Sequence, residues 1–88
     1  MYRVILLREA EKHYTKASEK LIRRINKAIE QIRLNPVFGP HIKKLHGRLE
    51  NKYSYVLGDW RIIYEVDMDK KVIEIWYIET RGDVYKKR

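Results

Sequence analysis

The chain has 88 residues, no cysteine and a formal net charge of +8 at pH 7, from 20 Lys and Arg against 12 Asp and Glu. This length favours one domain over 1–88 with a thin core, and the lack of thiols excludes disulfides, cysteine zinc sites and thiol nucleophiles. The charge and a pI of about 9.8 favour a polyanion or an acidic protein as partner, with a merely soluble basic surface as the alternative.

The first third of the chain predicts one strand and two helices. Residues 2–7 are rich in apolar and β-branched side chains, as is typical of a strand, and residues 9–16 follow as a short helix. The second helix gives the strongest signal, because Ser18 is a suitable N-cap and apolar residues recur at helical spacing from 21 to 32. Pro36 ends this helix, since proline disfavours helical geometry in the residue before it.

The rest of the chain predicts a connection and then three strands joined by tight turns. Residues 37–51 form the connection, which is long enough to hold a turn or a short edge strand. Gly58-Asp59 and the segment 67–70 are turn signals. The strands that these turns separate span residues 53–57, 60–66 and 71–79.

Together these elements follow the order β-α-α-β-β-β. We therefore predict an α+β fold of two layers, in which a helical hairpin packs on a mainly antiparallel sheet. Residues 71–79 are apolar on both faces, which suggests a central strand. The apolar run at 4–7 is too short for a signal peptide or a membrane span, so we expect a cytoplasmic protein.

The sequence offers cations and aromatic residues rather than a metal or nucleotide motif. Asp67 and Asp69 flank a turn and are expected to form it, and His13, His41 and His46 show no catalytic spacing. No glycine pattern matches a nucleotide-binding loop, so we expect neither a metal nor a cofactor. Most aromatic residues of the strands are expected in the core. The residues suited to phosphate or unpaired bases are Lys43, Lys44, His46, Arg48, Lys52, Arg61, Arg81 and Tyr85.

One segment resembles a known family. The run YSYVLGDWRIIYEV at 53–66 is similar to the central segment of RelE/ParE-superfamily toxins, which often read Gly-Asp-aromatic-Arg before an apolar stretch. Asn35-Pro36 after the long helix, KLHG at 44–47 and RGDVY at 81–85 also resemble the family, so the resemblance covers almost the whole chain in order.

The resemblance implies an activity and a set of residues. RelE-type toxins are endoribonucleases that cut messenger RNA in the ribosomal A site, and a co-expressed antitoxin silences them. The resemblance implies that the functional residues of this chain are Arg61, Arg81 and Tyr85. One departure stands near Ser54, where such toxins often carry a lysine or arginine. The candidates to replace that cation are Lys43, Lys44, Arg48 and Lys52.

Metal-free RNA cleavage through attack of the 2′-hydroxyl on the adjacent phosphate needs a base, stabilised charge and a proton donor. The cations that follow Tyr85 in the sequence favour its phenolate, so Tyr85 is the expected base. Arg61 and Arg81 are expected to clamp the phosphate. Arginine is a poor proton donor, so we expect His46 or a ribosomal group to protonate the leaving oxygen.

Two other functions stay open at this stage. The chain could be a ParE-like toxin that inhibits DNA gyrase by binding, or a basic module that binds RNA or the ribosome without toxicity. For the toxin, the expected partners are mRNA, the ribosome and an acidic, amphipathic antitoxin that covers the helical hairpin or a sheet edge. A toxin–antitoxin heterotetramer is common in such systems, and no membrane is involved.

Overall fold

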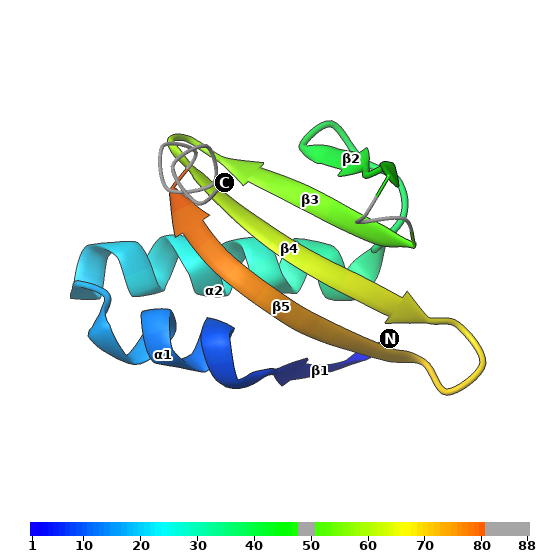
Figure 1. Cartoon of the computed structure of the whole chain (residues 1–88), viewed down its shortest axis with the longest axis horizontal. Helices are drawn as coiled ribbons and strands as arrows, with labels where there is room; N and C mark the ends of the chain where they lie inside the picture. The colour runs from blue at the N-terminus through cyan, green and yellow to red at the C-terminus, as the bar shows by residue number, and fades with distance from the viewer. Residues whose placement is uncertain (48–50, 81–88) are drawn as a thin grey trace.

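Within residues 1–47 and 51–80, the part of the chain that the structure describes, a five-stranded sheet carries two helices on one face and leaves the other face open. Figure 1 shows this computed structural model from the open side, with α2 passing behind the strands and α1 beside β5. In chain order the elements are β1 (Arg3–Leu6), α1 (Arg8–Lys16), α2 (Glu19–Leu34), β2 (Ile42–Lys44), β3 (Lys52–Leu57), β4 (Trp60–Asp67) and β5 (Val72–Thr80).

The helical hairpin forms where the apolar spacing and the cap predict it. The Oγ atom of Ser18 accepts a hydrogen bond from the N–H of Leu21 at 3.2 Å, which satisfies one of the unpaired donors at the start of α2. The helix then buries Ile25, Ala28 and Ile32 on one side. This helix contributes more of the core than α1, of which only Ala10 is buried. Neither described helix is long and apolar enough to cross a membrane.

The strands lie in the order β1-β5-β4-β3-β2. β1 runs parallel to β5, and the other neighbours pair antiparallel, so the predicted mainly antiparallel α+β fold is confirmed. The long connection holds the short edge strand β2, one of the two possibilities that its length allowed. Because β2 pairs with β3, it extends the open face beyond the strands that the sequence marked clearly.

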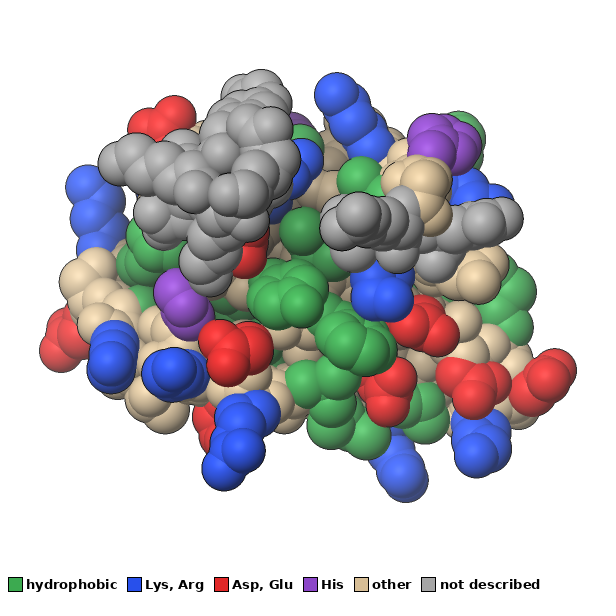
Figure 2. Space-filling view, in the orientation of Figure 1, with side chains coloured by type: hydrophobic (Ala, Val, Ile, Leu, Met, Phe, Trp, Pro, Cys, Tyr) green, Lys and Arg blue, Asp and Glu red, His purple; other side chains and the backbone are tan. Residues whose placement is uncertain are grey.

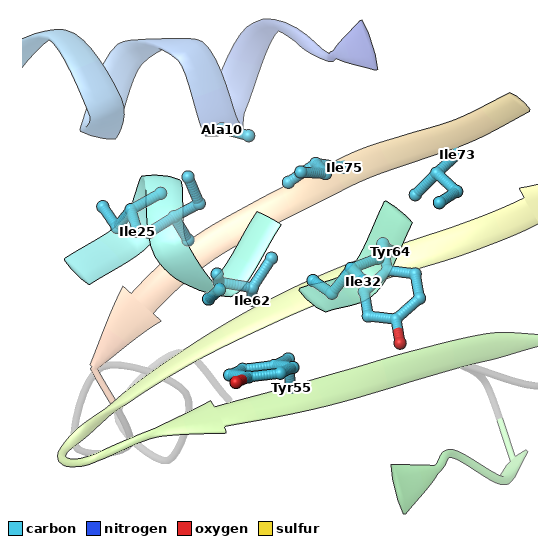
Figure 3. Close-up of a cluster of buried hydrophobic side chains, with 10 residues drawn as sticks. Ala10, Ile25, Ile32, Tyr55, Ile62, Tyr64, Ile73 and Ile75 are labelled. Carbon is cyan, nitrogen blue, oxygen red and sulfur yellow. The ribbon is translucent and has the colours of Figure 1, made fainter. Parts of the chain in front are cut away.

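The core lies between α2 and the middle strands (Figure 3). Ile25 and Ile32 of α2 face Ile62 and Tyr64 of β4, and the side chain of Ile75 closes the cluster from β5. These five side chains are almost completely buried. Fully burying one such aliphatic or aromatic side chain is worth about 1.5–3 kcal/mol, so this contact fixes which side of β4 faces the helices.

The hydroxyl of Tyr64 connects the core to the loop that follows α2. It donates a hydrogen bond to the backbone carbonyl of Pro36 at 2.6 Å. Burial, with a smaller effect of the neighbouring phenols of Tyr53 and Tyr55, raises the pKa of Tyr64 well above its ordinary value. The hydroxyl therefore keeps its proton and acts as a permanent donor, which holds the start of the loop that leads to β2.

The turn between β3 and β4 requires glycine. Gly58 has a φ of +62°, a conformation that side chains with a Cβ rarely adopt. A Cβ at this position would also lie 2.6 Å from a guanidinium nitrogen of Arg24. The predicted Gly-Asp hairpin is thus confirmed, and it sets the register that carries Arg61.

Replacing Tyr64 by Phe is expected to lower the free energy of unfolding by about 1–2 kcal/mol, because the buried carbonyl of Pro36 loses its donor. Urea denaturation followed by circular dichroism measures the change. Tyr53→Phe is the matched control: the half-buried ring of Tyr53 stacks on Tyr64, and removing its hydroxyl should change stability by less than about 0.5 kcal/mol. Equal losses in the two variants would contradict the assigned role of the hydrogen bond.

Candidate nucleic-acid interface

Strand alternation places Arg61 on the open face of the sheet. Ile62 and Tyr64 point into the core beneath the helices (Figure 3). Successive side chains of a strand point to opposite faces, so Arg61 and Ile63 project to the other side. The packing of β4 against α2 therefore determines where the guanidinium lies.

A row of four residues crosses the sheet at Arg61, and we call it the Arg61 row. The carbonyl of His41, just before β2, accepts a hydrogen bond from the N–H of Val56 at 2.9 Å. Val56 lies opposite Arg61, and Arg61 lies opposite Glu79 of β5. Neighbouring strands are about 4.8 Å apart, so the row places a histidine and a carboxylate on either side of the arginine.

A concave site, which we call the Arg61 hollow, opens between β2, β3 and β4. Its volume is about 270 Å³. Lys43 of β2 lies opposite Ser54 of β3, so a cation from the edge strand faces the hollow together with Arg61. The lining residues are Pro40, His41, Lys43, Leu45, Ser54, Val56 and Arg61.

The Arg61 hollow contains polar atoms that lack partners within the described part of the chain. The Oγ atom of Ser54 and the Nε atom of Arg61 are both buried and make no hydrogen bond there. Ser54 is only 1% exposed. Leaving a buried donor or acceptor unpaired costs about 1–3 kcal/mol, so these groups have an unsatisfied capacity that a polar ligand could meet. Two cationic side chains beside them favour an anion.

The open face is uneven in charge. Figure 2 shows a band of hydrophobic side chains across its middle, with acidic side chains gathered toward the turn between β4 and β5. At that end Lys44 lines a different hollow, together with Glu65, Asp67 and Asp69. Its acidic surroundings make Lys44 a weaker candidate for anion binding than Lys43.

Lys52 is occupied by contacts within the fold. Its Nζ atom lies 3.3 Å from a carboxylate oxygen of Glu65 and 4.3 Å from the ring centre of Trp76. The side chain of Lys52 is only 15% exposed. Of the cations proposed to replace the one missing near Ser54, Lys43 therefore lines the same hollow as Arg61. Lys52 instead contacts Glu65 and Trp76.

The other predicted site residues are not gathered in the Arg61 hollow. His46 is exposed and is not one of the lining residues. Arg48, Arg81 and Tyr85 lie outside the described residues. β5 ends at Thr80, which lies opposite Trp60 and next to the Arg61 row.

Several residues at this site gave no signal in the sequence. Ser54 looked like a loss of charge, yet it supplies a buried hydroxyl to the Arg61 hollow. Glu79 is only 7% exposed and lies opposite Arg61. His41 lies at the hollow, whereas the basic neighbours of His46 in the sequence favour His46. The pairing registers of β2 with β3 and of β4 with β5 would have identified these residues, but they cannot be read from local sequence.

The acidic residues do not form a metal site in the part of the chain that the structure describes. No three His, Cys, Asp or Glu side chains there are placed to hold an ion. A carboxylate oxygen of Asp67 accepts a hydrogen bond from the N–H of Lys70 at 3.0 Å, as expected of a turn-forming aspartate.

Comparison with known protein families gives one match that spans residues 4–85. Its description is "ParE toxin of type II toxin-antitoxin system, parDE". A search of curated proteins gave no match.

Solved structures share the fold. An archaeal RelE–RelB complex from Pyrococcus horikoshii is 30% identical, with a TM-score of 0.75 over 92% of this chain and 96% of that chain. The RelBE2 toxin–antitoxin complex from Mycobacterium tuberculosis is 20% identical, with a TM-score of 0.79 over 91% and 98%. The isolated RelE toxin of E. coli is 21% identical, with a TM-score of 0.78 over 99% and 94%.

Replacing Lys52 by Ala is expected to lower the free energy of unfolding by about 1 kcal/mol, because both the ion pair with Glu65 and the contact with Trp76 are lost. Lys43→Ala, on the exposed edge strand, should change it by less than about 0.5 kcal/mol. Thermal and urea unfolding of the two variants compare the effects. Greater destabilisation by Lys43→Ala would show that the structural roles of the two lysines are reversed.

Proposed function

Since this chain belongs to the RelE/ParE superfamily of toxins of type II toxin–antitoxin systems, we propose that it is an endoribonuclease that cuts messenger RNA on the ribosome and so arrests translation. The observation that carries this proposal is the Arg61 hollow, where two cations from different strands lie beside buried, unpartnered polar atoms. Such a site suits one phosphate of an RNA backbone. We propose that residues 1–88 form a single toxin domain that acts in the cytoplasm.

The proposed reaction uses the 2′-hydroxyl of the RNA as nucleophile and needs no metal or cofactor. Arg61 and Arg81 hold the non-bridging oxygens of the scissile phosphate, where negative charge grows in the transition state. Lys43 adds a second cation from β2. The phenolate of Tyr85 removes the proton from the 2′-hydroxyl, and the products are a 2′,3′-cyclic phosphate and a 5′-hydroxyl.

The ribosome completes this sparse site by orienting the RNA. Holding reacting groups in the productive geometry is worth up to about 7–11 kcal/mol. The half-buried rings of Trp76 and Tyr77, whose centres lie 6.4 Å apart on β5, offer aromatic surface for bases on either side of the cut. In this proposal Lys44, His46, Arg48 and Lys52 contribute only to the general positive field that attracts RNA.

An antitoxin is the proposed protein partner. Related toxins have been solved as complexes with RelB or with YefM, and the YoeB–YefM complex of Staphylococcus aureus is described as a heterotetramer. On this chain Leu34, the last residue of α2, and Phe38, in the loop after it, are large apolar side chains that are 65% and 78% exposed. They flank a small hollow that also reaches His41 and Ile42 of the edge-strand region. An acidic, amphipathic segment would meet apolar residues here and then Lys43 on β2.

Inhibition of DNA gyrase is the second candidate function, favoured by the description of the matching family. A gyrase inhibitor would act by binding and would not need the phosphate site at Arg61. Purified toxin can be tested in parallel for mRNA cleavage on ribosomes and for inhibition of DNA supercoiling. Inhibited supercoiling with intact mRNA would replace the nuclease proposal, and inactivity in both assays would favour a non-toxic RNA-binding module.

Arg61→Ala should lower the rate of mRNA cleavage on ribosomes about 100-fold or more, because the transition state loses a principal donor. The rate is measured by primer extension in a purified translation system. Arg23→Ala is the matched control, since Arg23 is an exposed arginine on α2, away from the hollow, and its loss should leave cleavage within about twofold. Undiminished cleavage by a folded Arg61→Ala variant would remove Arg61 from the site.

Phe38→Ser should weaken binding of the antitoxin encoded beside the toxin gene about tenfold or more, because an exposed aromatic anchor is lost. Met68→Ser is the control, since Met68 is an exposed apolar residue in the turn between β4 and β5. Isothermal titration calorimetry measures both affinities. Equal affinity of the Phe38 variant and the unmodified toxin would exclude this surface from the complex.

A further inference from the structure

We propose that His41 is the proton donor of this site, which goes beyond the phosphate clamp and rests on the proposed nuclease function. The imidazole would give its proton to the 5′-oxygen as that oxygen leaves the scissile phosphate. Three observations support this role: where the ring is held, how far it lies from Arg61, and which other groups line the Arg61 hollow.

His41 is held at the rim of the hollow by two contacts. Its backbone carbonyl is bonded to the N–H of Val56, which anchors it to β3. Its ring centre lies 5.4 Å from that of Tyr55, with the two planes tilted by 42°. The side chain is nevertheless exposed, so a substrate can reach it. The ring is therefore positioned by the fold without being enclosed by it.

The spacing between His41 and Arg61 suits a phosphodiester. They lie on opposite sides of β3 in the Arg61 row, so their backbones are two strand spacings apart, or about 10 Å. Both residues line the Arg61 hollow. A phosphate between them would present its non-bridging oxygens to the guanidinium and a bridging oxygen to the imidazole.

Imidazole is the group in the Arg61 hollow best suited to give up a proton near neutral pH. Among protein side chains it is the one whose unperturbed charge change falls between about pH 5 and 8. A guanidinium keeps its protons, and a serine hydroxyl is a poor acid, so Arg61 and Ser54 are suited to hydrogen bonding only. The titratable or charged groups that face His41 are Tyr55 from β3, Lys43 from β2 and Arg61 from β4.

The step balances without an added reactant. The 2′-oxygen forms a bond to phosphorus and loses its proton to the phenolate assigned above to Tyr85. The bond from phosphorus to the 5′-oxygen breaks, and that oxygen takes the proton of the His41 imidazolium. The products are the cyclic phosphate, a 5′-hydroxyl, a neutral imidazole and a neutral phenol, with no change in oxidation state.

The test compares His41→Gln with His46→Gln, since both remove an exposed histidine from the loop and edge-strand region. Single-turnover cleavage is measured on programmed ribosomes with an mRNA cut at the site mapped for the unmodified toxin. His41→Gln should slow cleavage about 100-fold and remove the alkaline limb of the pH–rate profile, because general acid catalysis contributes about 10²–10⁴-fold. His46→Gln should stay within about threefold of the unmodified toxin.

A second substrate separates proton donation from a structural effect. A sulfur atom replaces the bridging 5′-oxygen at the mapped site, and thiolate leaves without needing a proton. On this substrate His41→Gln should cleave within about threefold of the unmodified toxin. Equal cleavage of the oxygen substrate by His41→Gln, or an equal defect on both substrates, would overturn the role of His41 alone. An unmodified toxin that cuts no mRNA would overturn the proposed function and this inference with it.

Discussion

The fold depends on how β4 is held against α2. Ile62 and Tyr64 are completely buried beneath the helix, and a rotation of the strand that exposed them would forfeit several kcal/mol of hydrophobic burial. Because successive side chains of a strand point to opposite faces, this packing directs the neighbours of Ile62 and Tyr64 on β4 away from the helices. Arg61 must then face the open side, where Glu79 of β5 lies opposite it. The core and the candidate site are thus two faces of the same strand.

The edge strand β2 supplies the second wall of the hollow at Arg61. It is only three residues long, and it reaches its position because the loop before it is fixed by the hydrogen bond between Tyr64 and Pro36. Pairing with β3 then sets Lys43 opposite Ser54 and His41 beside Val56. Without β2, Arg61 would lie on an open sheet with no second wall.

Sequence reasoning predicted the elements with strong local signals. The cap at Ser18, the apolar stripe of α2 and the turn at Gly58 are properties of neighbouring residues, so each can be read locally. Arg61 was identified because a charge interrupts an apolar strand and because the surrounding run resembles a toxin family. The parallel pairing of β1 with β5 depends on contacts between distant segments and had no local signature.

The site was harder to predict for the same reason. Three lysines look equivalent in sequence but have different surroundings in the fold. Lys43 lines the Arg61 hollow, Lys44 lies among acidic residues near the turn between β4 and β5, and Lys52 pairs with Glu65. His46 was favoured by its basic neighbours, whereas the register of a three-residue strand favours His41. Pairings of this kind are decided by tertiary packing, and single-sequence patterns do not contain them.

The chemical form of the RNA ends tests the account most directly. An mRNA incubated with the toxin on ribosomes can be recovered, and the new ends can be identified by mass spectrometry. Attack by the 2′-hydroxyl at a site built from Arg61 and its neighbours predicts a 2′,3′-cyclic phosphate upstream of the cut and a 5′-hydroxyl downstream. A 5′-phosphate on the downstream fragment, or intact mRNA under conditions where the toxin arrests growth, would contradict it.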